Sequence, residues 1–337
     1  MKDGFVKAAA ASPVIKVADA EYNAQQVIKC MAAAREKGVK LLVFPELTLT
    51  GCFCYDLVGH RVLLEGAAAA LEKVVKASEG TDMLVLVGLP YAFGSRLLSC
   101  AAVVYDGALL ALIPRENVAG SRFADYPGDG ELVYVGALET ELCPGALFAH
   151  RSLNGLTVAV ELGADVTAAD SPTAYYAQSG ATVIAQMASF PATVSSTDDA
   201  LLAARYESKR FACGLVLAAP GKGESTTDNV CSGLCLVSEN GVVLAQDERA
   251  DSMAEIDVDF LLNLRRRTGG FDLEAEELCT ALWGGELEET TLTREYVKHP
   301  HLPARAEDVP AYCERVLDIQ VSGLVKRMEY AHLDHCV

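Results

Sequence analysis

The feature that most constrains the fold is a regular alternation of short apolar strands and amphipathic helices over about the first 250 residues. Residues 18–37 place Val27 and Met31 on one helical face, and Gly38 is a typical helix end. An apolar strand at residues 39–44 follows at once. The other expected strands are 7–11, 83–88, 156–162, 181–187, 215–218 and 255–258, and the other expected helices are 66–78, 173–179, 198–213 and 260–267.

Two hairpins interrupt this alternation. Residues 98–105 and 108–113 flank Asp106-Gly107, and residues 233–237 and 242–245 flank Asn240-Gly241. Both pairs favour the two-residue turns that connect antiparallel strands. Strands, helices and hairpins in this order predict an α/β fold in which helices cover the outer faces of the sheets.

The sequence changes in character after about residue 250. Residues 269–291 form an acidic stretch without clear periodicity, and Pro300, Pro303 and Pro310 mark an extended arm. An amphipathic helix is expected at residues 311–329. We therefore expect one domain at residues 1–268, followed at 269–337 by the acidic stretch, the arm and a linker helix.

Charge and composition exclude several classes of function. The chain has 28 basic and 46 acidic side chains, a net charge of −18, which opposes binding to nucleic acids and anionic membranes. The longest apolar run, residues 211–219, is far shorter than the roughly 20 residues of a membrane span. Residues 1–12 lack the pattern of a signal peptide, so we expect a cytoplasmic protein.

The eleven cysteines are scattered through expected strands and helices, which predicts reduced and mostly buried thiols. Cys52 and Cys54 have no matching Cys/His pair at metal-site spacing, so no metal is expected.

A carboxylate follows the strand at residues 39–44, because Pro45-Glu46 comes directly after it. Strand ends in α/β sheets often line a ligand crevice, and a partly desolvated Glu there is suited to acid–base chemistry. From these residues alone, a solvated carboxylate at a loop start remains an equal alternative.

Residues 44–51, Phe-Pro-Glu-Leu-Thr-Leu-Thr-Gly, resemble the catalytic-Glu motif of the nitrilase (carbon–nitrogen hydrolase) superfamily. Within it, the chain resembles the glutaminase domain of glutamine-dependent NAD⁺ synthetases. Further segments that carry this resemblance are residues 4–13, Cys54, Asp56-Leu57, 221–228, 238–241, 255–258 and 320–324. The resemblance implies an α-β-β-α sandwich, here with a C-terminal arm and helix. It implies no cofactor.

The resemblance also implies a Glu–Lys–Cys mechanism. The thiolate attacks the glutamine amide, Glu moves protons, and Lys stabilises the oxyanion on the way to a thioester. The ammonia released then passes to a synthetase domain.

Carried over to this chain, the Glu of that trio is Glu46, while Arg115 stands at the Lys position. Residues Glu161 and Asp165 fix the register of the nucleophile motif, so Gly163 stands where the family has its Cys. Glycine offers no side chain for covalent attack. Glu161 and Asp165 are further candidates for the pocket.

Several alternatives stay open at this stage. Arg115 either contacts an oxyanion or is a surface loop residue, and Cys52 or Cys54 either replaces the nucleophile or packs as a small apolar residue. The expected substrate-binding segments, residues 116–123, 186–190 and 195–199, keep little of the family pattern. The loop at residues 221–228 is either structural or a contact surface.

Three functions follow. The first is an inactive domain that works by binding or assembly, as a homo-oligomer or beside an NAD⁺ synthetase or synthetase domain. The second is an active amidase or glutaminase with altered catalytic residues. The third is the scaffold domain of a longer synthetase fed by free ammonia, since Val337 falls where the synthetase domain would be expected to begin.

Overall fold

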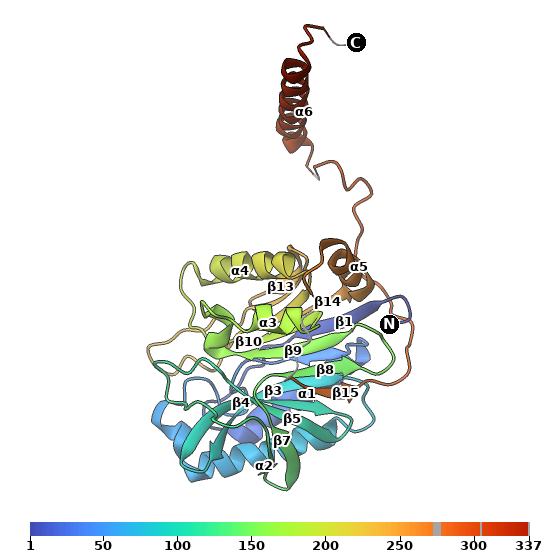
Figure 1. Cartoon of the computed structure of the whole chain (residues 1–337). Helices are drawn as coiled ribbons and strands as arrows, with labels where there is room; N and C mark the ends of the chain where they lie inside the picture. The colour runs from blue at the N-terminus through green and yellow to red at the C-terminus, as the bar shows by residue number, and fades with distance from the viewer. Residues whose placement is uncertain (272–277, 304, 336–337) are drawn as a thin grey trace. The chain divides into compact units, whose positions relative to one another are not determined.

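The computed structural model describes residues 1–271, 278–303 and 305–335 of the chain (Figure 1). The chain divides into two compact units, Met1–Thr293 and Arg294–Val337. The first unit contains the two sheets and the candidate site, and the second contains the last long helix.

Two sheets form the first unit. The eight-stranded sheet has the order β14-β1-β2-β3-β4-β5-β7-β6, and the seven-stranded sheet has the order β13-β12-β11-β10-β9-β8-β15. The strands of the first sheet are β1 (Phe5–Ala10), β2 (Leu41–Val43), β3 (Leu84–Phe93), β4 (Arg96–Tyr105), β5 (Ala108–Pro114), β6 (Glu131–Val135), β7 (Leu138–Leu142) and β14 (Ser252–Asp257). Those of the second are β8 (Ala146–His150), β9 (Thr157–Leu162), β10 (Val183–Met187), β11 (Gly214–Ala218), β12 (Cys235–Glu239), β13 (Val242–Asp247) and β15 (Cys279–Trp283).

Alternation along the strands explains why the sheets are covered on both faces. Successive side chains of a strand point to opposite faces. In β3, Leu84 and Leu86 enter the core between the two sheets, whereas Val85 and Val87 pack under the helices. A strand buried on both faces therefore has a continuous apolar sequence, as the first part of β3 does.

The helices lie on the outer faces. Helices α1 (Ala20–Glu36) and α2 (Arg61–Ala77) pack on the first sheet, while α3 (Thr173–Gln178) and α4 (Ser196–Arg210) pack on the second. In Figure 1, α2 and α4 lie on opposite sides of the strands. Helix α5 (Val258–Thr268) follows β14. This arrangement confirms the expected α/β fold with helix–sheet–sheet–helix layers.

Both predicted hairpin turns are present. Asp106 and Gly107 have φ values of 44° and 76°, and Asn240 and Gly241 have 44° and 86°. Positive φ at both central positions is the requirement of a type I′ turn, which Asn-Gly and Asp-Gly satisfy at low cost.

Four strands were not predicted from the sequence: β6, β7, β8 and β15. Strands β6 and β7 form an edge hairpin in which alternate residues face solvent, and the apolar run of β6 is only four residues long while β7 has none. Strand β15 lies within the stretch expected to be irregular, and it pairs in parallel with β8. Its Trp283 is fully buried and donates its indole N–H to the Phe148 carbonyl at 2.9 Å. Residues 272–277 of that stretch lie outside the described residues.

The second unit contains a short 3₁₀ turn, η3 (Ala306–Asp308), and α6 (Val309–Ala331). Pro310 lies in the first turn of α6, where its missing N–H has no intrahelical partner to lose. Within the described ranges, none of the helices combines the length and apolar character needed to cross a membrane. The ten cysteines in those ranges are all free thiols.

Candidate functional site

Three loops meet between the two sheets and bring together the three positions predicted from the sequence. Glu46 follows β2, Arg115 follows β5, and Gly163 follows β9. The main-chain N–H of Glu46 also donates to the carbonyl of Ala188 at 3.2 Å, which ties the Glu46 loop to the loop after β10. The site is therefore built from both sheets.

The Glu46 carboxylate is buried and already has donors. Its side chain is 1% exposed. The Ser99 hydroxyl on β4 donates to Oε1 at 2.6 Å, and Arg115 Nη1 lies 3.3 Å from the same oxygen. Sequence reasoning missed Ser99, although a lone hydroxyl in the apolar run of β4 was a usable signal.

Arg115 forms a buried ion pair with Glu46. Its side chain is 9% exposed, and its Nε donates to the carbonyl of Asn117 at 2.7 Å. A guanidinium stays protonated and needs several acceptors, and this loop supplies a carboxylate and a carbonyl. Arg115 is thus an ion-pair partner of Glu46 rather than an exposed loop cation.

Gly163 leaves the space that a nucleophile would use, and Glu46 fills it. A Cβ built on Gly163 would lie 2.8 Å from Glu46 Cδ and closer still to Oε2. Side chains at position 163 would also be strained, because its φ is +53°, in the left-handed region. A cysteine here therefore requires the Glu46 carboxylate to move.

Asp165 fixes the loops rather than facing a ligand space. Its carboxylate accepts the main-chain N–H groups of Asn117 at 2.6 Å, Glu116 at 3.2 Å and Leu162 at 3.4 Å. These bonds join the loop after β5 to the turn after β9. Asp165 is therefore a positioning residue for Arg115 and Gly163.

Glu161 lies in a buried polar cluster on β9. It accepts hydrogen bonds from Ser171 at 3.2 Å, from Thr173, and from Gln186 Nε2 at 2.9 Å. The same Gln186 amide donates to Glu207 at 3.1 Å. Burial raises the pKa of Glu161 to about 8, so its neutral form predominates at neutral pH.

This raised pKa predicts a pH-dependent stability. The folded chain keeps the Glu161 proton up to about pH 8, whereas the unfolded chain loses it near the ordinary value of 4.5. The stabilisation from Glu161 is therefore fully present below about pH 4.5 and is lost as pH rises through 8. The free energy of unfolding falls by up to about 1.4 kcal/mol per pH unit in this range. In urea titrations from pH 5 to 8, Glu161→Gln should flatten this slope. The exposed control Glu36→Gln should leave it intact, and equal slopes in wild type and Glu161→Gln would contradict the assignment.

Cys52 and Cys54 lie beside the Glu46 loop with neutral thiols. Cys52 Sγ donates to the main-chain carbonyl of Glu46 at 2.6 Å, and Cys54 Sγ donates to that of Thr50 at 2.9 Å. Burial raises the pKa of Cys52 well above its usual range and that of Cys54 to about 11. Neutral buried thiols are poor nucleophiles.

The loop at residues 221–228 is joined to the same region through Glu224. This buried carboxylate accepts the main-chain N–H of Cys52 at 2.9 Å, and burial raises its pKa to about 7. The contact gives the loop a structural role in holding the segment after Glu46.

Comparisons with known proteins identify the family of this chain. The carbon-nitrogen hydrolase family model matches residues 7–261. The glutamine-dependent NAD(+) synthetases of Mycobacterium tuberculosis and Mycobacterium leprae are each 32% identical over 96% of this chain and 51% of their own length. The chain thus spans about half the length of these curated relatives.

Solved structures show the same fold at low identity. A glutamine-dependent NAD(+) synthetase from Cytophaga hutchinsonii superposes with a TM-score of 0.64 at 17% identity, over 74% of this chain and 42% of that one. A double mutant of an amidase from Nesterenkonia sp., in complex with acrylamide, gives 0.59 at 16% identity, over 79% and 98%. On the family match and the sequence relatives together, the chain belongs to the carbon–nitrogen hydrolase family of the nitrilase superfamily.

Proposed function

We propose that this chain is a glutaminase-like domain that has lost amide hydrolysis and acts through binding or assembly. The observation that carries the proposal is the position of the Glu46 carboxylate in the space beside Gly163. A thioester mechanism needs a side-chain nucleophile in that space, and glycine has none.

The surrounding groups do not replace the missing nucleophile. The Cys52 thiol is neutral and is committed to the Glu46 carbonyl. Arg115 and Ser99 both donate to Oε1 of Glu46, which holds the carboxylate in a buried ion pair.

The assembly part of the proposal rests on α6. Its side chains Leu317, Val321 and Leu324 follow helical spacing and are 59%, 55% and 46% exposed. An apolar stripe of this kind is a typical contact surface. Its occupant would be a second copy of this chain, an NAD⁺ synthetase, or a synthetase domain.

One observation favours a second candidate, the scaffold domain of a longer synthetase fed by free ammonia. The curated relatives are about twice as long as this chain. Both candidates share the loss of glutamine hydrolysis, and the reading frame beyond residue 337 distinguishes them.

Covalent trapping tests the loss of a nucleophile. We expect fluoroacetamide, an amide-sized electrophile, to leave the intact mass of the folded chain unchanged, because neither Cys52 nor Cys54 reacts. Iodoacetamide should label Cys313, the exposed cysteine of α6. A fluoroacetamide adduct on Cys52 of the folded chain would overturn the proposal, because it would reveal a reactive nucleophile beside Glu46.

A further inference from the structure

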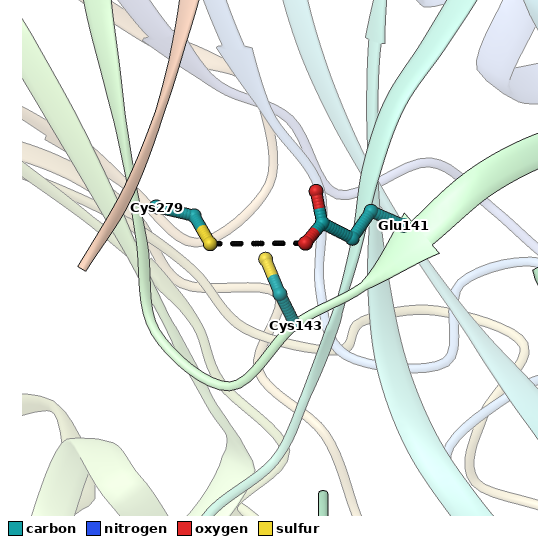
Figure 2. Close-up of side chains that lie close together, drawn as sticks. All are labelled: Glu141, Cys143 and Cys279. Atoms are coloured by element: carbon teal, nitrogen blue, oxygen red, sulfur yellow. Dashed lines mark hydrogen bonds between the residues drawn. The ribbon is translucent and has the colours of Figure 1, made fainter. Parts of the chain in front are cut away.

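Three metal-ligating side chains meet away from the Glu46 site. Glu141, Cys143 and Cys279 have ligand atoms that all lie within 4.8 Å of one another. Cys279 Sγ is 3.8 Å from Glu141 Oε1. Figure 2 shows the two sulfurs and the carboxylate close together, with Cys279 on a different segment from Glu141 and Cys143.

The fold explains why these residues meet. Glu141 lies on β7, and Cys143 follows two positions later, so both side chains point to the same side. Cys279 begins β15 and pairs with Ala146 at the start of β8. The cluster therefore joins β7 of the first sheet to β15, the edge strand of the second.

We propose that Glu141, Cys143 and Cys279 form a zinc site with two sulfur ligands, one carboxylate oxygen and a fourth position for water. Zinc takes cysteine and carboxylate ligands in a tetrahedron, with bonds of about 2.3 Å to sulfur and about 2.0–2.2 Å to oxygen. Such bonds place the ligand atoms about 3.5–3.8 Å apart, so the observed cluster needs only a small contraction. Glu141 is exposed and is free to make that adjustment.

The carboxylate distinguishes a metal site from a disulfide. A Cys143–Cys279 disulfide would not involve the Glu141 carboxylate, whereas a zinc ion would bind it as a third ligand. Gly130 borders the cluster, since a Cβ there would lie 2.9 Å from Glu141 Oε1 and 3.8 Å from Cys143 Cβ. The missing side chain keeps room on that side for a ligand. A net charge of −18 also favours binding of a divalent cation.

Bound zinc would cross-link the two sheets at their edges. Strand β15 has β8 as its neighbour in the sheet order, so a metal bond to β7 adds a second attachment. Because zinc binds the folded state, it should raise the melting temperature of the full chain.

The test uses the full chain, kept reduced, stripped with a chelator and then exposed to zinc chloride. After desalting, we expect inductively coupled plasma mass spectrometry to find about one zinc ion per chain. Cys279→Ser and Cys143→Ser should lower zinc affinity by more than the 10- to 100-fold typical of losing an outer-shell partner, and Glu141→Gln should weaken it. Cys30→Ser, which changes another partly buried thiol, should keep the zinc and its thermal stabilisation.

Cobalt supplies a second readout. Cobalt bound by wild type and Cys30→Ser should show thiolate-to-metal charge-transfer absorption, which Cys279→Ser should lose. Cys279 is partly exposed, so this variant keeps the test usable if the variant at the buried Cys143 fails to fold. Zinc retention by Cys279→Ser equal to that of wild type, or no retained zinc in wild type, would overturn the proposal. A Cys143–Cys279 disulfide that persists in the zinc-treated chain under reducing conditions would also overturn the proposal.

Discussion

Replacing Arg115 with methionine is expected to destabilise the fold by about 3–5 kcal/mol. The change leaves the Glu46 carboxylate, 1% exposed, without its cationic partner. Among the residues that the structure describes, Ser99 then remains as the side-chain donor to that carboxylate. An unpaired charge in a buried site costs far more than the intact pair contributes, which is why the single change has a large effect. The free energy of unfolding from urea titration measures it.

The double variant Arg115→Met with Glu46→Gln supplies the decisive control for this prediction. It removes both charges together, so most of the lost stability should return. The exposed Arg122→Met variant should change stability by no more than about 0.5 kcal/mol. If the double variant is as unstable as Arg115→Met, the cost does not come from an uncompensated Glu46 charge.

Replacing Arg265 with methionine is expected to lower the free energy of unfolding by at least about 3 kcal/mol, because several buried carbonyls lose their donor. This side chain of α5 is 7% exposed and donates only to main-chain carbonyls among its hydrogen bonds given by the structure. Its acceptors are Ala212 at 3.0 Å, Ala181 at 2.6 Å, Phe211 at 3.1 Å and, more weakly, Ala177 at 3.4 Å. These carbonyls lie in the last turn of α3 and in the segments that directly follow α3 and α4, near helix C-terminal ends that favour a cation.

The neighbouring Arg266 provides a matched control, because it lies on the same helix but is exposed. Arg266→Met should change the free energy of unfolding by no more than about 0.5 kcal/mol. Methionine fills much of the arginine volume, so the difference between the two variants reports the lost hydrogen bonds rather than a cavity. Similar losses at the two positions would argue against a special role for Arg265.

Much of this fold could be predicted from the sequence, because turn preferences and helical periodicity are encoded within a few neighbouring residues. Asp106-Gly107 and Asn240-Gly241 carry the turn preference in two residues, and the helix near Val27 carries its period within a few turns. Strand β15 escaped prediction because its order depends on β8, which lies far away in the sequence. Its side chains alternate in exposure and give no apolar run.

The candidate site divides in the same way. The family motifs located Glu46, Arg115 and Gly163, and the structure brings these three positions together. The contact of Glu224 with Cys52 and the meeting of Cys143 with Cys279 join segments that no sequence spacing relates. Such contacts follow from sheet order and loop packing, which short-range patterns do not encode.

Loss of amide hydrolysis is tested by measuring ammonia release from glutamine by the purified full chain beside Glu46→Ala. We expect no release above buffer from either protein, because Gly163 supplies no nucleophile and Arg115 holds Glu46 in a buried pair. The double variant Gly163→Cys with Arg115→Lys, run in parallel, reports whether the old pocket still accepts the family's residues. Ammonia release by the natural chain that Glu46→Ala abolishes would show that the domain still hydrolyses glutamine.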